Sequence, residues 1–337
     1  MFVLRKFFLL VITYLTYFIS SAQEGISIYS DYLSDNYYLL YPSMAGAANC
    51  AKLRISARQQ WFGHADAPQL QTLTFNTKVA DESPSGIGLT LYNDKNGFHT
   101  QRGAKATYAH HLIFNRGNED LNQLSFGLSA GFSQTSLDQS RFNSEFIAND
   151  PSVGQGVLVK GSDFNVDFGF SYFYGDFYAH ATVRNALEQK RKIYSDYESF
   201  NLRKYIGSVG YTFGDREKLW YEPSVMFQYT EYTKGKTLDL NMKLYKPLEN
   251  GTVWGGLSYR NGFDSTEFLM AGEVSDQKLQ YITPFVGTNL GKFMISYTYS
   301  HVIGKVNFDN SGFHQLTIGF DFLCRRQRYH CNCPAVN

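Results

Sequence analysis

The chain has 337 residues, a formal net charge of +1 and 17% aromatic residues, with 25 tyrosines and 28 phenylalanines. Because there is no basic excess to neutralise phosphates, the composition disfavours nucleic-acid binding. No internal apolar run is long enough to cross a bilayer as a helix. Membrane β-barrels escape that test, since their strands alternate lipid-facing and lumen-facing residues and average to mild polarity.

The first segment has the pattern of a secretory signal peptide. A basic start, Arg5-Lys6, precedes an apolar stretch over residues 7–19, and Ser20-Ser21-Ala22 supplies the small residues of a cleavage site. We therefore expect cleavage after Ala22, so that residues 1–22 are removed and Gln23 begins an exported chain. A single N-terminal membrane anchor is the alternative, and the short apolar stretch disfavours it.

Residues 23–49 are rich in tyrosine and show no regular pattern, so we expect an irregular segment that could plug a barrel. From Cys50 almost to the C-terminus, the sequence alternates with period two, which is typical of β-strands. The clearest stretches are residues 53–61, 72–79, 124–133, 164–172 and 315–322. We therefore predict an all-β chain with a barrel over residues 50–323 and a short periplasmic tail over residues 324–337.

Alternation alone fits both a soluble sandwich and a membrane barrel, but the signal peptide and the alternating lengths of the connections favour an antiparallel outer-membrane barrel. Short turns are predicted at residues 81–85, 115–120, 174–176, 214–218, 246–251 and 289–292. Longer connections are predicted at residues 62–69, 93–99, 135–162, 185–201, 231–235, 261–278 and 303–312. These thirteen connections imply about fourteen strands. We assign Phe268–Val274 to a loop, because an extra strand would make the count odd.

Four cysteines lie near the two ends of the predicted barrel: Cys50, Cys324, Cys331 and Cys333. An even number of cysteines in an oxidising compartment predicts disulfides, and three pairings are possible. In two of these three pairings, Cys50 bonds to Cys331 or to Cys333. We hypothesise that two disulfides pin the basic tail across the seam between the first and last strands. A metal site that includes His330 is the alternative, but Cys-x-Cys with one histidine is a weak zinc pattern.

Three short motifs resemble functional sites but lack the necessary context. Gly127–Gly131 matches the Gly-x-Ser-x-Gly nucleophile elbow, yet the strand pattern runs through it, so we interpret these small residues as making room in the lumen. In His110-His111, alternation directs one imidazole outward and the other inward. Asn93–Gly97 contains a lysine among its oxygen ligands, which fits a loop better than a calcium site. We therefore predict no catalytic, cofactor or metal site.

Charged residues occur in the polar sets of the predicted strands, among them Arg54, Arg58, Lys78 and Asp167. Charges that pair across a wet lumen are common in membrane barrels, and this is the simpler interpretation. The functional alternative is a selectivity surface, or a dock for a plugging segment.

A series of short motifs then follows in order along the chain: Tyr41-Pro42-Ser43-Met44-Ala45-Gly46, Arg58-Gln59-Gln60-Trp61-Phe62-Gly63, Gly86-Ile87-Gly88, Asn149-Asp150-Pro151, Val183-Arg184-Asn185, Glu222-Pro223-Ser224, Trp254–Arg260, Ser296–Tyr299 and Gly312-Phe313-His314-Gln315. Over nearly the whole mature chain, these motifs resemble the PorP/SprF family of outer-membrane proteins, which are associated with type IX secretion and gliding motility. Pro42 and Gly46 would set a turn before the first strand. Trp61 would fall in an aromatic belt, and Arg260 and His314 belong to the later motifs.

The chain departs from the family pattern in two places: it has Tyr-Pro-Ser-Met-Ala-Gly for the usual Asn-Pro-Ala-x-Ala-Gly, and Gly-Phe-His-Gln for Gly-Ser-His-Glu. Its cysteine-bearing tail resembles the SprF-like, gliding-associated branch more than the PorP branch. The resemblance implies a non-enzymatic component that binds and anchors, or helps to secrete, a large adhesin-like surface protein. It also implies contacts with periplasmic and outer-membrane parts of the secretion system and with the lipid bilayer.

Two other functions stay open at this point. A diffusion channel or small-molecule transporter is possible, because fourteen strands enclose a wide lumen unless residues 23–49 plug it. A membrane-embedded hydrolase or acyltransferase would need an acid/base group at a rim, and the sequence identifies none.

Overall fold

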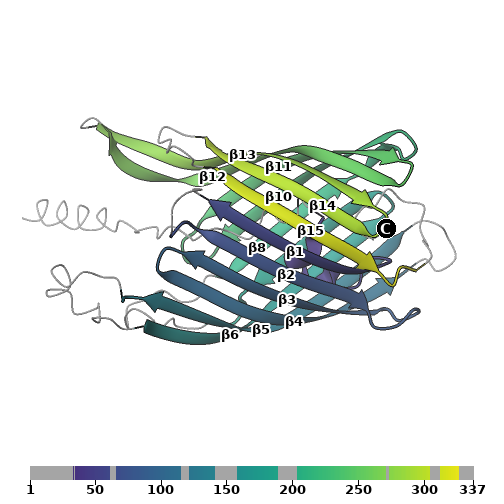
Figure 1. Cartoon of the computed structure of the whole chain (residues 1–337), viewed down its shortest axis with the longest axis horizontal. Coiled ribbons are helices and arrows are strands. Elements are labelled where there is room, and N and C mark those ends of the chain that lie inside the picture. Colours follow the sequence, from purple (N-terminus) through teal and green to yellow (C-terminus); the bar gives the residue numbers. More distant parts are fainter. Residues whose placement is uncertain are drawn as a thin grey trace, which may run out of the picture.

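The computed structural model describes Leu33 and residues 35–60, 66–114, 121–140, 158–188, 203–270, 273–303 and 312–325. These residues are all-β apart from short 3-10 turns, as predicted (Figure 1). The strands are β1 (Ala51–Gln60), β2 (Gln69–Lys78), β3 (Ser85–Asn96), β4 (His99–Ile113), β5 (Asn122–Asp138), β6 (Leu158–Tyr174), β7 (Phe177–Arg184), β8 (Lys204–Tyr211), β9 (Phe213–Asp215), β10 (Leu219–Thr230), β11 (Lys236–Leu248), β12 (Gly251–Met270), β13 (Glu273–Leu290), β14 (Phe293–Ile303) and β15 (Phe313–Phe322).

The sheet closes into a barrel because β1 pairs with β2 on one side and with β15 on the other. All pairings are antiparallel, and each of the other neighbours follows in sequence order. β8 and β9 are two parts of one strand, interrupted at Thr212, and both pair with β10. The fifteen labelled strands therefore make a fourteen-stranded barrel, which confirms the predicted fold and count.

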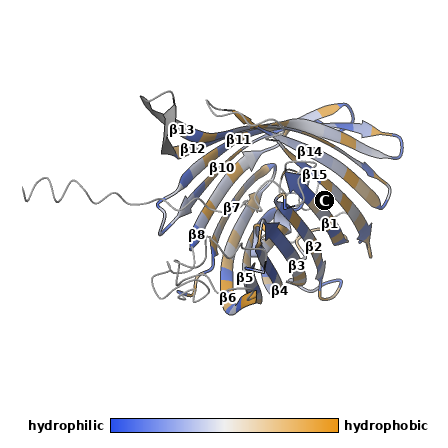
Figure 2. Ribbon diagram, turned by 60° about the vertical axis from the view of Figure 1, so that its left-hand side comes forward, coloured by the Kyte–Doolittle hydropathy of each residue, from blue (hydrophilic) through white to orange (hydrophobic). Residues whose placement is uncertain are grey.

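Alternation gives the barrel an apolar outer face and a largely polar inner face. Along β15, Leu316 and Ile318 are 47% and 49% exposed, whereas Gln315 and Thr317 are buried. Figure 2 shows apolar residues spaced along the strands in this way. An outward apolar face on a closed antiparallel sheet suits lipid rather than water. Among the described residues, no helix has the length and apolar character needed to cross a bilayer.

The two rims of the barrel carry connections of different length. At one rim, two-residue turns join β6 to β7, β11 to β12 and β13 to β14. We call this the short-turn rim; β1 begins and β15 ends there. We call the opposite end the long-loop rim. In outer-membrane barrels, short turns face the periplasm and long loops face outward.

Two connections at the long-loop rim differ from the prediction. Residues 93–99, predicted as a longer loop, are mostly strand, because β3 continues to Asn96 and β4 begins at His99. The expected loop over residues 261–278 is mostly strand, because β12 continues to Met270 and β13 begins at Glu273. The two strands stay paired from Ser265 with Lys278 to Met270 with Glu273, after a register shift between Asn261 and Ser265. The assignment of Phe268–Val274 to a loop is therefore wrong. The strand count is unaffected, because the segment lengthens two existing strands.

Candidate functional site

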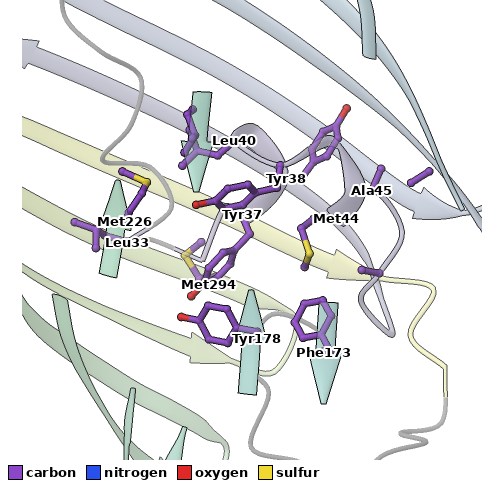
Figure 3. Packing of buried hydrophobic residues seen from close by; sticks show 14 of the residues in the cluster. Leu33, Tyr37, Tyr38, Leu40, Met44, Ala45, Phe173, Tyr178, Met226 and Met294 are labelled. Atoms are coloured by element: carbon purple, nitrogen blue, oxygen red, sulfur yellow. The ribbon is translucent and has the colours of Figure 1, made fainter. Parts of the chain in front are cut away.

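Residues 35–49, which we call the lumen segment, lie inside the barrel. They contain two 3-10 helices, η2 (Tyr37–Leu39) and η3 (Pro42–Met44), with every residue of both helices buried. η3 contacts β4, β5 and β6, and η2 contacts β2. Figure 3 shows side chains of the segment among residues of the barrel wall. The segment is thus a folded insert with contacts on several sides of the lumen.

The lumen segment shares an apolar core with the wall. Leu40 and Tyr41 of the segment are 1% and 0% exposed, and they belong to one cluster with inward-facing wall residues. These wall residues are Phe173, Ile206, Met226, Phe285 and Met294. Burying one side chain of this size stabilises a fold by roughly 1.5–3 kcal/mol. The inner face is therefore not uniformly polar, because it supplies the apolar surface against which the segment packs.

Glu222 of β10 accepts hydrogen bonds from three tyrosine hydroxyls. The donors are Tyr37 at 2.6 Å, Tyr178 of β7 at 2.5 Å and Tyr245 of β11 at 2.5 Å. The Glu222 side chain is buried, so it depends on these donors to replace water. Because Tyr37 belongs to the lumen segment, this carboxylate joins the segment to three wall strands.

Lys243 of β11 lies opposite Glu222 in the pairing of β10 with β11 and is also buried. Its Nζ is 5.9 Å from the ring centroid of Tyr37, 5.3 Å from that of Tyr245 and 4.9 Å from that of Trp254. Aromatic faces attract a cation at such distances. Tyr37 therefore contacts both members of the cross-strand pair, Glu222 with its hydroxyl and Lys243 with its ring.

Three further hydroxyls of the lumen segment bond to other strands. The hydroxyl pairs are Tyr38 with Thr107 at 2.7 Å, Tyr41 with Ser208 at 2.7 Å and Ser43 with Ser171 at 2.6 Å. The backbone carbonyl of Ala45 is 3.0 Å from His111 Nε2, which must donate because a carbonyl only accepts. These bonds reach β4, β6 and β8, so the segment is held around much of the wall.

His111 and His110 confirm the prediction that one imidazole points inward and the other outward. His111 is buried in the lumen, with its Nδ1 2.8 Å from Ser125 Oγ. His110 Nδ1 is 3.2 Å from Ser85 Oγ, which also bonds to the outward-facing, half-exposed Tyr108. Among the described residues, no group of histidine, cysteine and acidic side chains could hold a metal ion.

Glycine is required at two places where the segment meets the wall. A Cβ at Gly127 would lie 2.2 Å from the backbone carbon of Pro42 and from the nitrogen of Ser43. The interpretation that Gly127–Gly131 makes room in the lumen therefore agrees with the structure. Gly46 has φ +67°, where other residues are strained, and a Cβ there would lie 2.7 Å from the carbonyl oxygen of Thr77. It turns the chain from η3 towards β1.

Charged groups hold the start of the lumen segment. Asp35 Oδ2 is 3.4 Å from Lys52 Nζ and 3.6 Å from Arg54 Nη2, while Arg54 Nη1 donates to Asp321 Oδ1 at 2.5 Å. Burial tends to raise the pKa of Asp35, but Lys52, Arg54 and Lys243 together hold that pKa below its ordinary value. Asp35 therefore stays ionised at neutral pH. Arg54 faces inward as predicted, and its partners include a carboxylate of the segment.

The other predicted site residues are placed as follows. Arg58 faces the lumen with its guanidinium 4.1 Å from the ring centroid of Phe313. Arg260 forms a two-bond pair with Asp239, each contact 2.7 Å long. His314, a residue of the last motif, faces outward: it contacts the outward-facing Tyr297, and its neighbours Phe313 and Gln315 are the inward ones. Trp61 lies outside the described residues.

Cys50 and Cys324 form a disulfide across 274 residues of sequence, at the short-turn end of the seam between β1 and β15. This pairing corrects the hypothesis that both disulfides reach into the tail. Cys50 and Cys324 are bonded to each other, so neither can also bond to Cys331 or Cys333. Cys331 and Cys333 lie outside the described residues. The bond joins the end of the lumen segment to the end of the last strand.

Replacing Cys50 and Cys324 with serine should lower the thermal unfolding midpoint of the barrel in detergent without preventing closure. The paired strands still close the seam, but removing a native disulfide costs about 2–5 kcal/mol. The midpoint can be followed by heat modifiability in SDS gels. Cys331→Ser with Cys333→Ser is the matched control, and it should keep the wild-type midpoint. An unchanged midpoint in the Cys50/Cys324 variant would contradict a stabilising role for this bond.

Three comparisons relate the chain to known proteins. The family described as "Type IX secretion system membrane protein PorP/SprF" matches residues 21–320. No curated protein matches the chain. Among similar solved structures, CdiB from Acinetobacter baumannii has 10% sequence identity and a TM-score of 0.40, and the match covers 81% of this chain and 60% of that chain. BamA from Haemophilus ducreyi lacking POTRA domains 1–3 has 9% identity and a TM-score of 0.41, with 81% and 70% covered. The TodX monoaromatic hydrocarbon channel has 9% identity and a TM-score of 0.44, with 81% and 88% covered. The chain thus spans less than two thirds of the CdiB chain.

The likeness to these three structures is low, with TM-scores of 0.40 to 0.44. The family match is stronger evidence of what the chain is, because it covers most of the chain. It agrees with the motifs in the sequence and with a closed fourteen-stranded barrel that has an apolar outer face. The protein is therefore an outer-membrane β-barrel component of type IX secretion, and the chain belongs to the PorP/SprF family.

Proposed function

We propose that this barrel is a non-enzymatic partner-binding component, which anchors or helps to secrete a large adhesin-like surface protein and contacts periplasmic parts of the type IX machinery. The observation that carries the proposal is the lumen segment. Its apolar core with the wall and its bonds to Glu222 occupy the space that a diffusion pathway would need. In this proposal the segment is a plug, and the working surfaces are the two rims.

The short-turn rim supports the periplasmic part of the proposal. Arg325 follows the disulfide; its backbone N–H donates to the carbonyl of Asn49 at 3.1 Å, and its Nε donates to Asp81 at 2.6 Å. These bonds fix the point at which the basic tail leaves the barrel. Asp81 lies between β2 and β3, so Arg325 is held against the first strands of the barrel. A basic tail held at this rim would be available to an acidic periplasmic partner.

The proposal is tested by affinity purification of the tagged, full-length protein from native membranes in a mild detergent, followed by mass spectrometry. We expect one large secreted protein together with type IX components. An unrelated outer-membrane barrel with the same tag is the control. Recovery of the barrel alone, with and without crosslinking, would contradict partner binding and would favour the channel alternative, which conductance measurements in planar bilayers then decide.

A further inference from the structure

The outward face of β6 indicates where the hydrocarbon of the membrane ends on one side of the barrel. Its outward positions from the short-turn rim upward are all apolar or aromatic: Tyr174, Tyr172, Phe170, Phe168, Val166 and Phe164. This run is about 33 Å long, and at the usual strand tilt of about 40° it covers roughly 25 Å of the membrane normal. That is the height of the apolar band of outer-membrane barrels. The next outward residues, Ser162 and Lys160, therefore lie at the edge of the hydrocarbon and among the lipid headgroups.

The neighbouring strands change from apolar to polar at the same register. Phe132 of β5 lies opposite Phe164 of β6. The next outward residue of β5 is Gln134, which lies opposite Ser162 on one side and opposite Arg102 of β4 on the other. β4, β5 and β6 lie side by side in Figure 1. An arginine in this polar row can place its guanidinium among headgroups while its methylene groups stay against apolar neighbours.

The outward face beyond this change carries more positive than negative charge. We call the following residues of β3, β4, β5 and β6 the outer patch: Asn93, Lys95, Thr100, Arg102, Gln134, Ser136, Asp138, Lys160 and Ser162. Three of them are basic and one, Asp138, is acidic. Lys95 pairs with Asp66 at 3.5 Å. Arg102 and Lys160 are exposed, so they are the cations that the outer patch offers to a ligand.

The guanidinium of Arg102 is held in place by its neighbours. Its Nε donates to Asn93 Oδ1 at 2.9 Å, and Asn93 Nδ2 donates to Gln71 Oε1 at 3.3 Å. An arginine has five N–H donors, and this bond uses one of them. The Nη atoms keep the fork of donors that binds phosphate oxygens with two parallel hydrogen bonds. Arg102 is thus oriented for an anionic group at the membrane surface.

Two aromatic rings lie on the membrane side of these cations. Phe132 and Phe164 are 67% and 36% exposed, and their ring centroids are 4.9 Å apart. Arg102 lies on the strand beside Phe132, and Lys160 lies beyond Phe164 on the same strand. The strand register places the Cα atoms of the two cations about 12 Å apart. A matching ligand has anionic groups joined to hydrocarbon chains, which is the chemistry of an anionic lipid.

We propose that the outer patch binds the phosphate-bearing headgroup of a lipid in the outer leaflet. Its phosphate groups contact Arg102 and Lys160, and the first part of an acyl chain lies against Phe132 and Phe164. The hydroxyl and amide groups of the outer patch supply further hydrogen bonds to the headgroup. This contact is independent of the surface partner, because it is made through the outside of the barrel wall.

Native mass spectrometry of the full-length protein in a non-ionic detergent tests the proposal, with diphosphoryl lipid A as the probe and phosphatidylcholine as the zwitterionic comparison. Arg102→Gln with Lys160→Gln removes both charges from exposed positions. Phe132→Ala removes one ring and keeps the charges. The matched control is Arg216→Gln with Lys218→Gln, which makes the same charge change in the turn between β9 and β10 at the short-turn rim.

We expect the wild type to bind diphosphoryl lipid A at least tenfold more tightly than phosphatidylcholine. The double charge variant should lose at least tenfold in affinity for lipid A, the Phe132 variant severalfold, and the control nothing. Heat modifiability establishes that every variant forms a folded barrel. Equal binding of the two lipids by the wild type, or unchanged lipid A binding by the double charge variant, would overturn the proposal. Displacement of lipid A by a tenfold excess of inorganic phosphate would overturn the choice of a lipid as the ligand.

Discussion

Replacing Gly127 with valine should displace the lumen segment and give the barrel a steady conductance that the wild type lacks. The Cβ alone would lie 2.2 Å from the backbone of Pro42 and Ser43, where no side chain can rotate away to relieve the clash. A Cβ at Gly169 of the adjacent strand would lie 2.9 Å from Cδ of the same proline, so the wall is close on that side as well. Valine favours strand geometry, so the barrel itself should still form.

Planar-bilayer recording of the purified proteins measures this effect, with heat modifiability as the check on folding. Gly207→Val is the matched control, because a Cβ there has its nearest neighbour at 3.9 Å. We expect the control and the wild type to remain closed. A wild-type protein that conducts as well as the Gly127 variant would show that the lumen segment does not seal the barrel. A closed Gly127 variant would show that the segment can shift without opening a path.

The barrel could be predicted from the sequence because its evidence is local. Each strand carries a period-two pattern, as in Leu316, Ile318 and Phe320 on one face of β15, and each connection carries its own turn residues. The number of connections then predicts an even number of strands, so that the first strand begins and the last strand ends at the same rim. The error at residues 261–278 has the same origin: the pattern there is strand-like, but length alone cannot tell an added strand from two strands that continue beyond the rim.

The lumen site could not be predicted, because it depends on contacts between distant parts of the chain. Tyr37 and Glu222 are 185 residues apart, and nothing in the local sequence connects them. One signal was available: Glu222 lies in one of the quoted motifs, at a lumen-facing position of its strand. The disulfide hypothesis is wrong for a related reason: four cysteines allow three pairings, and local sequence does not show which of them brings the sulfur atoms together, as the closed seam does for Cys50 and Cys324.

Replacing Glu222 with glutamine should weaken the attachment of the lumen segment more than any single tyrosine change. The carboxylate accepts three phenol hydroxyls, and an amide offers one acceptor oxygen and two unwanted donors. Buried Lys243 would also lose its neighbouring negative charge. Removing one partner from a buried charged network costs about 3–5 kcal/mol, so we expect a clear drop in the midpoint of denaturant unfolding.

A double-mutant cycle separates this local effect from general damage to the barrel. Tyr37→Phe removes one hydrogen bond to a charged acceptor, which costs about 1.5–3 kcal/mol in the wild type and should cost much less when Glu222 is already glutamine. Tyr38→Phe is the matched control, because its hydroxyl bonds to Thr107 and not to Glu222. Its cost should therefore be the same in both backgrounds. Additive costs for Tyr37 and Glu222 would mean that the carboxylate does not hold the segment, and the anchoring role would pass to the apolar contacts of Leu40, Met226 and Met294.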